Sequence, residues 1–403
     1  MAERSLVRIT GPLQTHEEGL WSHLLGRGYS PLSARNLLRL MSHLSRWLEA
    51  RRYRPNELTW ERIEDFFRER RQLGYTAFRT PHALAPILQY LESVLDFLVP
   101  PPPAVPLTEP DKLLSDYERF LAEERALQPT AIRGYRDLAR RFLVDEVGTA
   151  CLDLNEIKAD DIANFILCYS RLYSIGSTKL MVTALRSLFR FLYLRGSVEK
   201  DLAGAVPAVA GWRLSGLPKF ISSHELKRLL KSCDRRTRMG RRDFAVLLLL
   251  ARLGLRRCEV VALELDDIHW REGEIVVRGK GRKYARMPLP ADVGNAVAAY
   301  IQRGRPAIAS RAVFMTCRAP HRPMTGGAIT GILHQASDRA GLPRMGSHRL
   351  RHTAATQMLR HGATLSDIAQ VLRHRSIDTT SIYAKVDHQR LRELAQPWPG
   401  GIA

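Results

Sequence analysis

A run of prolines divides the first half of this sequence into two stretches that share one helical pattern. Residues 99–106 hold five prolines. Proline fixes φ and lacks the N–H that a helix needs, so this segment favours a stiff, extended spacer. On either side, residues 16–98 and 108–197 repeat apolar side chains at near-3.6 spacing between Gly and Pro breaks. The pattern predicts two helical bundles joined by the prolines.

The two helical stretches also resemble each other position by position. Pro31 aligns with Pro129, and residues 91–98 parallel residues 185–192, so the offset changes only from 98 to 94 residues. Amphipathic helices resemble one another by default, but this repeat favours two four-helix modules in tandem. We expect a module at 1–98, a linker at 99–107, a second module at 108–200, a linker at 201–218 and a third domain at 219–403.

Basic residues exceed acidic ones, mainly in the third domain. The 403-residue chain has 62 Lys and Arg against 41 Asp and Glu, a formal net charge of +21. Residues 221–403 hold 32 basic and 15 acidic residues, a net +17. Such an excess indicates a polyanionic partner, because neutralising phosphates releases counterions. The alternative is an Arg-rich composition without such a partner.

The cysteines and the N-terminus indicate a cytosolic chain. None of the five cysteines forms a CxxC pair or stands at metal-ligand spacing, so we expect reduced and mostly buried thiols. The first residues lack the apolar core of a signal peptide. The apolar run at 246–255 is short and interrupted by Arg252, so no membrane segment is expected.

The third domain combines helices with a small sheet. Ser222 or Ser223 can cap its first helix, and residues 244–253 predict a buried one. Residues 274–278 alternate as a strand and residues 284–288 return after a Gly-Lys-Gly turn. We expect a mainly α protein, in which two tandem helical modules precede a mostly helical α+β domain with a small antiparallel sheet.

The end of the sequence concentrates proton-handling and phosphate-binding side chains. His348 and Arg351 are three residues apart, so they share one face of a helix that Gly362 can end with a left-handed cap. Thr364 begins a capping-box pattern ahead of a second amphipathic helix. This helix delivers His374 at its end, and Tyr383 follows nine residues later.

These motifs closely resemble the end of a tyrosine recombinase, the phage integrase and Xer family. The matching runs are His348-x-x-Arg351, Leu-x-His374 and Thr-Thr-x-x-Tyr383. Upstream, Gly-Leu-Arg256-x-x-Glu and Gly-Lys280-Gly match the family in order and spacing. The resemblance covers residues 256–383, with a fainter likeness back to residue 108, where the second module resembles the family's DNA clamp.

The chemistry of phosphodiester cleavage explains the residue types. Charge grows on the non-bridging oxygens, so we assign Arg256 and Arg351 to that charge. The 5′ oxygen must receive a proton, for which we assign Lys280, although a solvated turn lysine is the alternative. Tyr383 is the expected nucleophile, and His348 is the expected base.

Other polar residues take supporting or structural roles. We expect His374 to donate a hydrogen bond to a phosphate oxygen, and Glu259 to orient Arg256 or a histidine. His352 and His361 are interpreted as capping or packing residues. The remaining expected phosphate contacts, which position a duplex without reading its sequence, are Arg241, Arg242 and Arg282.

The resemblance implies a site-specific recombinase or integrase that acts through 3′-phosphotyrosyl intermediates, without metal or other cofactors. It implies a homo-tetramer on paired double-stranded DNA sites, located in the bacterial cytoplasm at the nucleoid. A partner recombinase or an accessory DNA-bending protein is a possible further partner. The alternatives are a type IB topoisomerase and a catalytically silent DNA-binding protein of this fold. The resemblance also suggests that the tail at 388–403 docks on the next subunit, against the alternative of docking on its own domain.

Overall fold

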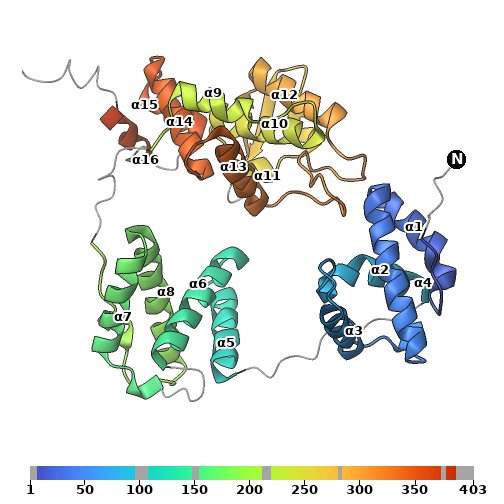
Figure 1. Ribbon diagram of the computed structural model, residues 1–403. Helices are drawn as coiled ribbons and strands as arrows, with labels where there is room; N and C mark the ends of the chain where they lie inside the picture. Colours follow the sequence, from blue (N-terminus) through green and yellow to red (C-terminus); the bar gives the residue numbers. More distant parts are fainter. Residues whose placement is uncertain are drawn as a thin grey trace, which may run out of the picture. The chain divides into compact units, whose positions relative to one another are not determined.

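The computed structural model describes residues 7–95, 108–147, 154–210, 219–279, 284–373 and 378–386. The chain divides into two compact units, one formed by residues 1–101 and 216–403 and the other by residues 102–215. Helices dominate both units, and the one sheet of the described residues lies in the C-terminal part of the first (Figure 1). None of the described helices combines the length and apolar character needed to cross a membrane.

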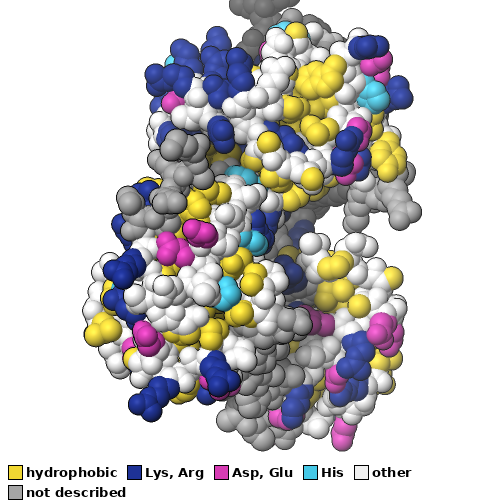
Figure 2. Space-filling model, turned by 90° about the vertical axis from the view of Figure 1, so that its right-hand side faces the viewer, with side chains coloured by type: hydrophobic (Ala, Val, Ile, Leu, Met, Phe, Trp, Pro, Cys, Tyr) yellow, Lys and Arg dark blue, Asp and Glu magenta, His cyan; other side chains and the backbone are white. Residues whose placement is uncertain are grey.

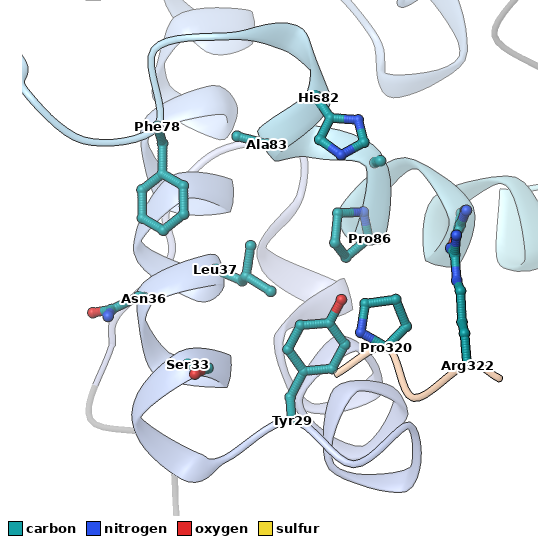
Figure 3. Close-up of a pocket in the computed structure, with 12 residues that line it drawn as sticks. Tyr29, Ser33, Asn36, Leu37, Phe78, His82, Ala83, Pro86, Pro320 and Arg322 are labelled. Carbon is teal, nitrogen blue, oxygen red and sulfur yellow. The ribbon is translucent and has the colours of Figure 1, made fainter. Parts of the chain in front are cut away.

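The N-terminal module consists of four helices around its own core. They are α1 (Glu17–Gly26), α2 (Pro31–Ala50), α3 (Trp60–Gln72) and α4 (Ala85–Leu95). Ser30 caps α2 by accepting a hydrogen bond from the Ser33 N–H, with Pro31 at the first helical position. Leu38 and Phe67 are fully buried in the core. Tyr29 of this module lines a pocket together with Pro320 and Arg322 of the third domain (Figure 3).

The second module repeats this order of four helices. They are α5 (Glu109–Glu123), α6 (Pro129–Phe142), α7 (Ala159–Leu172) and α8 (Ile175–Leu194). The rings of Phe142, Phe165 and Phe189 pack edge to face in its core. The start of the expected linker packs against the second module. In it, η6 (Leu202–Ala205) contacts α8, and the Val206 carbonyl accepts a hydrogen bond from Arg186.

The third domain surrounds the buried helix α10. Its helices are α9 (Ser223–Lys231), α10 (Arg238–Arg252), α11 (Arg257–Val261), α12 (Ala291–Arg303), α13 (Gly326–Ala340), α14 (Ser347–Arg360), α15 (Leu365–Leu372) and α16 (Asp378–Ser381), followed by η8 (Ile382–Val386). Ser222 caps α9. Helix α10 packs against α12 and α14, and its leucines form the centre of the core.

The sheet has the expected hairpin with one further short strand. Its antiparallel order is β1 (Ile268–His269), β2 (Glu274–Arg278) and β3 (Tyr284–Pro288), with Ile275 opposite Met287. The inward-facing Ile275, Val277 and Met287 are buried, as the alternating pattern requires. The expected fold class is therefore confirmed, while the tail at 388–403 lies outside the described residues.

The thiols depart from expectation. Of the four described cysteines, Cys233 is buried, Cys317 is intermediate, and Cys168 and Cys258 are exposed, all of them free. The expectation of mostly buried thiols is wrong for these four. Cys168 and Cys258 lie on the solvent-facing sides of their helices, because neighbours in the sequence of a helix point in different directions and apolar neighbours do not show which side a cysteine occupies.

Candidate active site

Arg256 stands at the first turn of α11, directly after the buried helix α10. Gly254 makes the connection with φ +59°, and a side chain there would approach Leu372 to 2.5 Å, so glycine is required. The Arg256 backbone N–H donates to Glu259 Oε2 at 2.8 Å, and its Nη1 donates to Oε1 at 2.7 Å. Glu259 thus fixes Arg256 at both its backbone and its guanidinium, as the sequence predicted.

Glu259 is an ionised carboxylate in a buried position. It is 2% exposed. Burial alone would raise the pKa of Glu259, but the hydrogen bond from the Arg256 backbone and the charges of Arg373 and Arg256 hold this pKa below its ordinary value. The carboxylate therefore stays negative between two arginines.

Arg351 projects from α14 toward the same place. It is 5% exposed, its Nη1 donates to the Gly254 carbonyl at 2.6 Å, and its other terminal nitrogen donates to the Leu372 carbonyl. Burial and the nearby charge of Arg256 lower the pKa of Arg351 to about 10, so the guanidinium remains charged at neutral pH. The fold thus concentrates two cations where a single anion could lie between them.

His348 precedes Arg351 by one turn and is exposed. Burial lowers the pKa of His348, and the charges of Arg351, Arg256 and Arg257 lower it further. The imidazole is therefore neutral at pH 7 and can serve as either donor or acceptor.

Tyr383 lies on η8, which packs against α14, and Figure 1 shows α14, α15 and α16 side by side. The side chain is 1% exposed, and burial raises the pKa of Tyr383 to about 12 despite the opposing charge of Arg351. Its hydroxyl lies 2.8 Å from His352 Nδ1. The interpretation of His352 as merely a capping or packing residue is therefore incomplete, since it contacts the expected nucleophile.

Two expected site residues, Lys280 and His374, lie outside the described residues. Their flanks are described: β2 ends at Arg278, β3 begins at Tyr284, and α15 ends at Leu372. The structure thus brings together four of the six expected residues, Arg256, His348, Arg351 and Tyr383.

The expected phosphate contacts divide into two kinds. Arg242 is buried and hydrogen-bonded to Asp243 and to the Met315 carbonyl. It is a structural residue, and its expected role was wrong because its position on α10 faces the core. Arg241 is half-buried and donates to the Arg303 carbonyl. Arg282 lies outside the described residues.

Arg373 is a further charged residue that the sequence did not single out. It ends α15 in the left-handed conformation with φ +54°, which glycine adopts more easily than arginine. Its Nη2 donates to Glu259 Oε2 at 2.7 Å, and its Nη1 contacts the Met287 sulfur and the Val371 carbonyl. Arg256 and Arg373 therefore share one carboxylate.

This shared carboxylate gives a first prediction, for Arg373→Gly. Glycine relieves the left-handed strain, worth about 1 kcal/mol, but leaves the whole charge of Glu259 on Arg256, which weakens the attraction of Arg256 for a phosphate. We expect DNA cleavage to slow about 10- to 100-fold, in line with one charge-assisted hydrogen bond of about 1.5–3 kcal/mol. Single-turnover cleavage, with thermal unfolding of the same sample, measures both effects.

The control is the same change in a Glu259→Gln background, where the carboxylate is absent. There the loss of Arg373 should slow cleavage much less than in the unaltered protein, because the two residues act through one interaction. Equal slowing in both backgrounds would show that Arg373 acts independently of Glu259.

Two family models match the chain. The model described as "Phage integrase family" matches residues 219–390, and that described as "Phage integrase, N-terminal SAM-like domain" matches residues 114–196. They correspond to the third domain and the second module, and residues 7–95 lie outside both ranges.

Relatives match over most of the chain. The putative integrase/recombinase y4rA of Sinorhizobium fredii (strain NBRC 101917 / NGR234) is 40% identical over 401 residues, which cover 97% of this chain and 95% of the relative. The tyrosine recombinase XerD of Listeria monocytogenes serotype 4b (strain F2365) is 30% identical over 70% of this chain and 96% of its own length.

Solved structures share the fold. The XerH site-specific recombinase bound to a palindromic difH substrate, in a post-cleavage complex, aligns with a TM-score of 0.55 and 23% identity over 70% of this chain and 83% of its own. A lambda integrase dimer (residues 75–356) bound to a COC′ core site aligns with a TM-score of 0.54 and 16% identity over 72% of this chain and 98% of its own. The family models and the two relatives place the chain in the phage integrase family of tyrosine recombinases, enzymes that cleave and rejoin DNA through a tyrosine nucleophile.

Proposed function

We propose that this recombinase is site-specific and joins DNA strands through a 3′-phosphotyrosyl intermediate on Tyr383. The observation that carries the proposal is the convergence of Arg256, of His348 and Arg351 on α14, and of Tyr383 on one cluster, where the charge of Arg351 opposes the rise in the pKa of the Tyr383 phenol. A covalent phosphotyrosine keeps the energy of the broken bond for rejoining.

The two arginines supply the stabilisation of the transition state. A pentavalent phosphate carries more charge on its non-bridging oxygens than the ground state, and guanidiniums held by carbonyls and by Glu259 do not need to reorganise to meet it. The electrostatic stabilisation that such fixed hydrogen-bond donors provide is larger in a site of low solvent exposure.

The leaving group and the phosphate require further donors. We assign Lys280 as the acid that protonates the 5′ oxygen and His374 as a donor to a phosphate oxygen, from their places in the family motifs.

The proposed partner is double-stranded DNA at paired sites. The net charge of +17 over residues 221–403 supports it, as does the abundance of Lys and Arg on the face shown in Figure 2, densest near the top of the view. The XerH and lambda integrase structures described above are complexes, with a difH substrate and with a core site respectively. We assign the second module as a DNA clamp, the N-terminal module as an additional one, and a homo-tetramer as the synaptic form.

A nicked duplex bearing the protein's own recombination site tests this function. The sites are sought as inverted repeats at the ends of the genomic segment that carries this sequence. A nick just 3′ of the scissile phosphate lets the short released fragment, which carries the 5′ hydroxyl, diffuse away, so the covalent complex accumulates. We expect a denaturation-resistant adduct in excess EDTA, because arginines replace the electrostatic role of a metal.

The products then separate the candidate activities. Exchange of strands between two sites supports recombination, whereas relaxation of supercoils without exchange would indicate a type IB topoisomerase. Binding without any adduct would indicate a catalytically silent protein, and cleavage that requires added magnesium would contradict the proposed chemistry.

A further inference from the structure

We propose that His352, and not His348, accepts the proton of the Tyr383 hydroxyl when the tyrosine attacks DNA, and returns it when the strand is rejoined. This inference rests on the proposed role of Tyr383 as the nucleophile. It assigns a catalytic role to a histidine that the sequence motifs leave unassigned.

The geometry places the acceptor at the reacting oxygen. His352 Nδ1 lies 2.8 Å from the Tyr383 hydroxyl oxygen, within the range for a direct proton transfer. The two rings are 5.7 Å apart at an interplanar angle of 60°. Since Tyr383 is 1% exposed, bulk water has little access to the phenol, whose hydroxyl is hydrogen-bonded to His352.

The protonation states suit this transfer. Burial, His348 and the charge of Arg351 lower the pKa of His352, so its imidazole is neutral. A phenol with a pKa raised to about 12 remains protonated at neutral pH and donates its hydrogen. In the proposed transfer Nδ1 is the acceptor, and the ring proton lies on Nε2.

His348 is placed for a different task. It is one turn before His352 on α14, but the charges that act on it are those of Arg351, Arg256 and Arg257. An imidazole among the phosphate-binding arginines is suited to donate to a phosphate oxygen. The spacing of four residues puts both histidines on one face of the helix, with different neighbours.

The transfer closes the reaction without any further co-reactant. The Tyr383 oxygen forms a bond to phosphorus while its proton moves to His352 Nδ1, and the bond from phosphorus to the 5′ oxygen breaks as that oxygen receives a proton from the acid. In rejoining, the 5′ hydroxyl attacks phosphorus and returns its proton to the conjugate base of the acid. The bond from phosphorus to the Tyr383 oxygen breaks, and the imidazolium of His352 protonates the departing tyrosine. The phosphodiester anion in the site favours this imidazolium.

The test combines His352→Asn with a more acidic nucleophile. Asparagine keeps a hydrogen-bonding group near the position of Nδ1 but is not a base. We expect single-turnover cleavage by the full-length variant to fall about 100-fold or more, the usual effect of a general base, with DNA affinity unchanged. Ring-fluorinated tyrosine at position 383, whose phenol ionises more readily, should restore most of this loss. A merely structural role would not produce such rescue.

His348→Asn is the matched control on the same helix. It should also slow cleavage, but fluorinated tyrosine should not restore it, because the loss concerns the phosphate. Rescue of His348→Asn and not of His352→Asn would overturn the proposal and make His348 the base. Cleavage by His352→Asn at the unaltered rate would also overturn it. Failure of the unaltered protein to form any adduct would instead remove the proposed function, and this role with it.

Discussion

Tyr383→Phe should abolish the covalent protein–DNA adduct while DNA binding stays within about twofold, since binding rests on phosphate contacts distributed over the protein. The phenyl ring keeps the buried volume, and the lost hydrogen bond to His352 costs about 1 kcal/mol of stability. Denaturing electrophoresis of the nicked-substrate reaction measures the adduct, and a gel-shift titration measures binding.

The matched control is Tyr300→Phe in the same domain. Tyr300 is also fully buried, and its hydroxyl accepts a hydrogen bond from the Met315 N–H at 3.1 Å. This variant loses a buried hydroxyl that bonds to the Met315 backbone and not to the active-site cluster. Its adduct should therefore form normally. A normal adduct from Tyr383→Phe would show that another residue is the nucleophile.

Arg351→Lys should slow cleavage by about 10²–10³-fold, the usual cost of one transition-state donor. Lysine keeps the charge but cannot reach the Gly254 and Leu372 carbonyls with a planar fork. Loss of these contacts should also lower the free energy of unfolding by about 1–3 kcal/mol. Single-turnover cleavage, at a temperature where both proteins are folded, isolates the catalytic part.

Arg360→Lys controls for the chemistry of the substitution. Arg360 lies in the last turn of the same helix, is exposed, and stacks on Phe220. Its replacement should leave cleavage near the unaltered rate. If both lysine variants cleave normally, the guanidinium of Arg351 contributes nothing specific to the transition state.

Local rules explain how much of the fold the sequence predicts. The capping box of Thr364 and Asp367 forms as expected, with both reciprocal hydrogen bonds, and Gly362 adopts φ +89° after α14. The strands of the hairpin have the expected bounds. In each case the signal lies within a few residues of its structural effect, so no tertiary contact is needed to interpret it.

Contacts between distant segments explain what the sequence does not predict. The His352–Tyr383 hydrogen bond joins residues 31 apart, and the Glu259–Arg373 pair joins residues 114 apart. The four-residue spacing of His348 and His352 shows that they share one face of a helix. It does not show which of the two histidines contacts the tyrosine. For Arg373, the sequence offered one signal: a helix end that often carries glycine carries an arginine instead.

The central claim is that Tyr383 becomes linked to a 3′ phosphate of DNA. Trapped adduct is digested with nuclease and protease, and the modified peptide is sequenced by mass spectrometry, with the DNA end assigned from 3′- and 5′-labelled substrates. We expect one modified peptide that contains phosphorylated Tyr383, with label retained only from the strand whose 3′ end is joined. A modified peptide without Tyr383, or linkage through a 5′ phosphate, would contradict it.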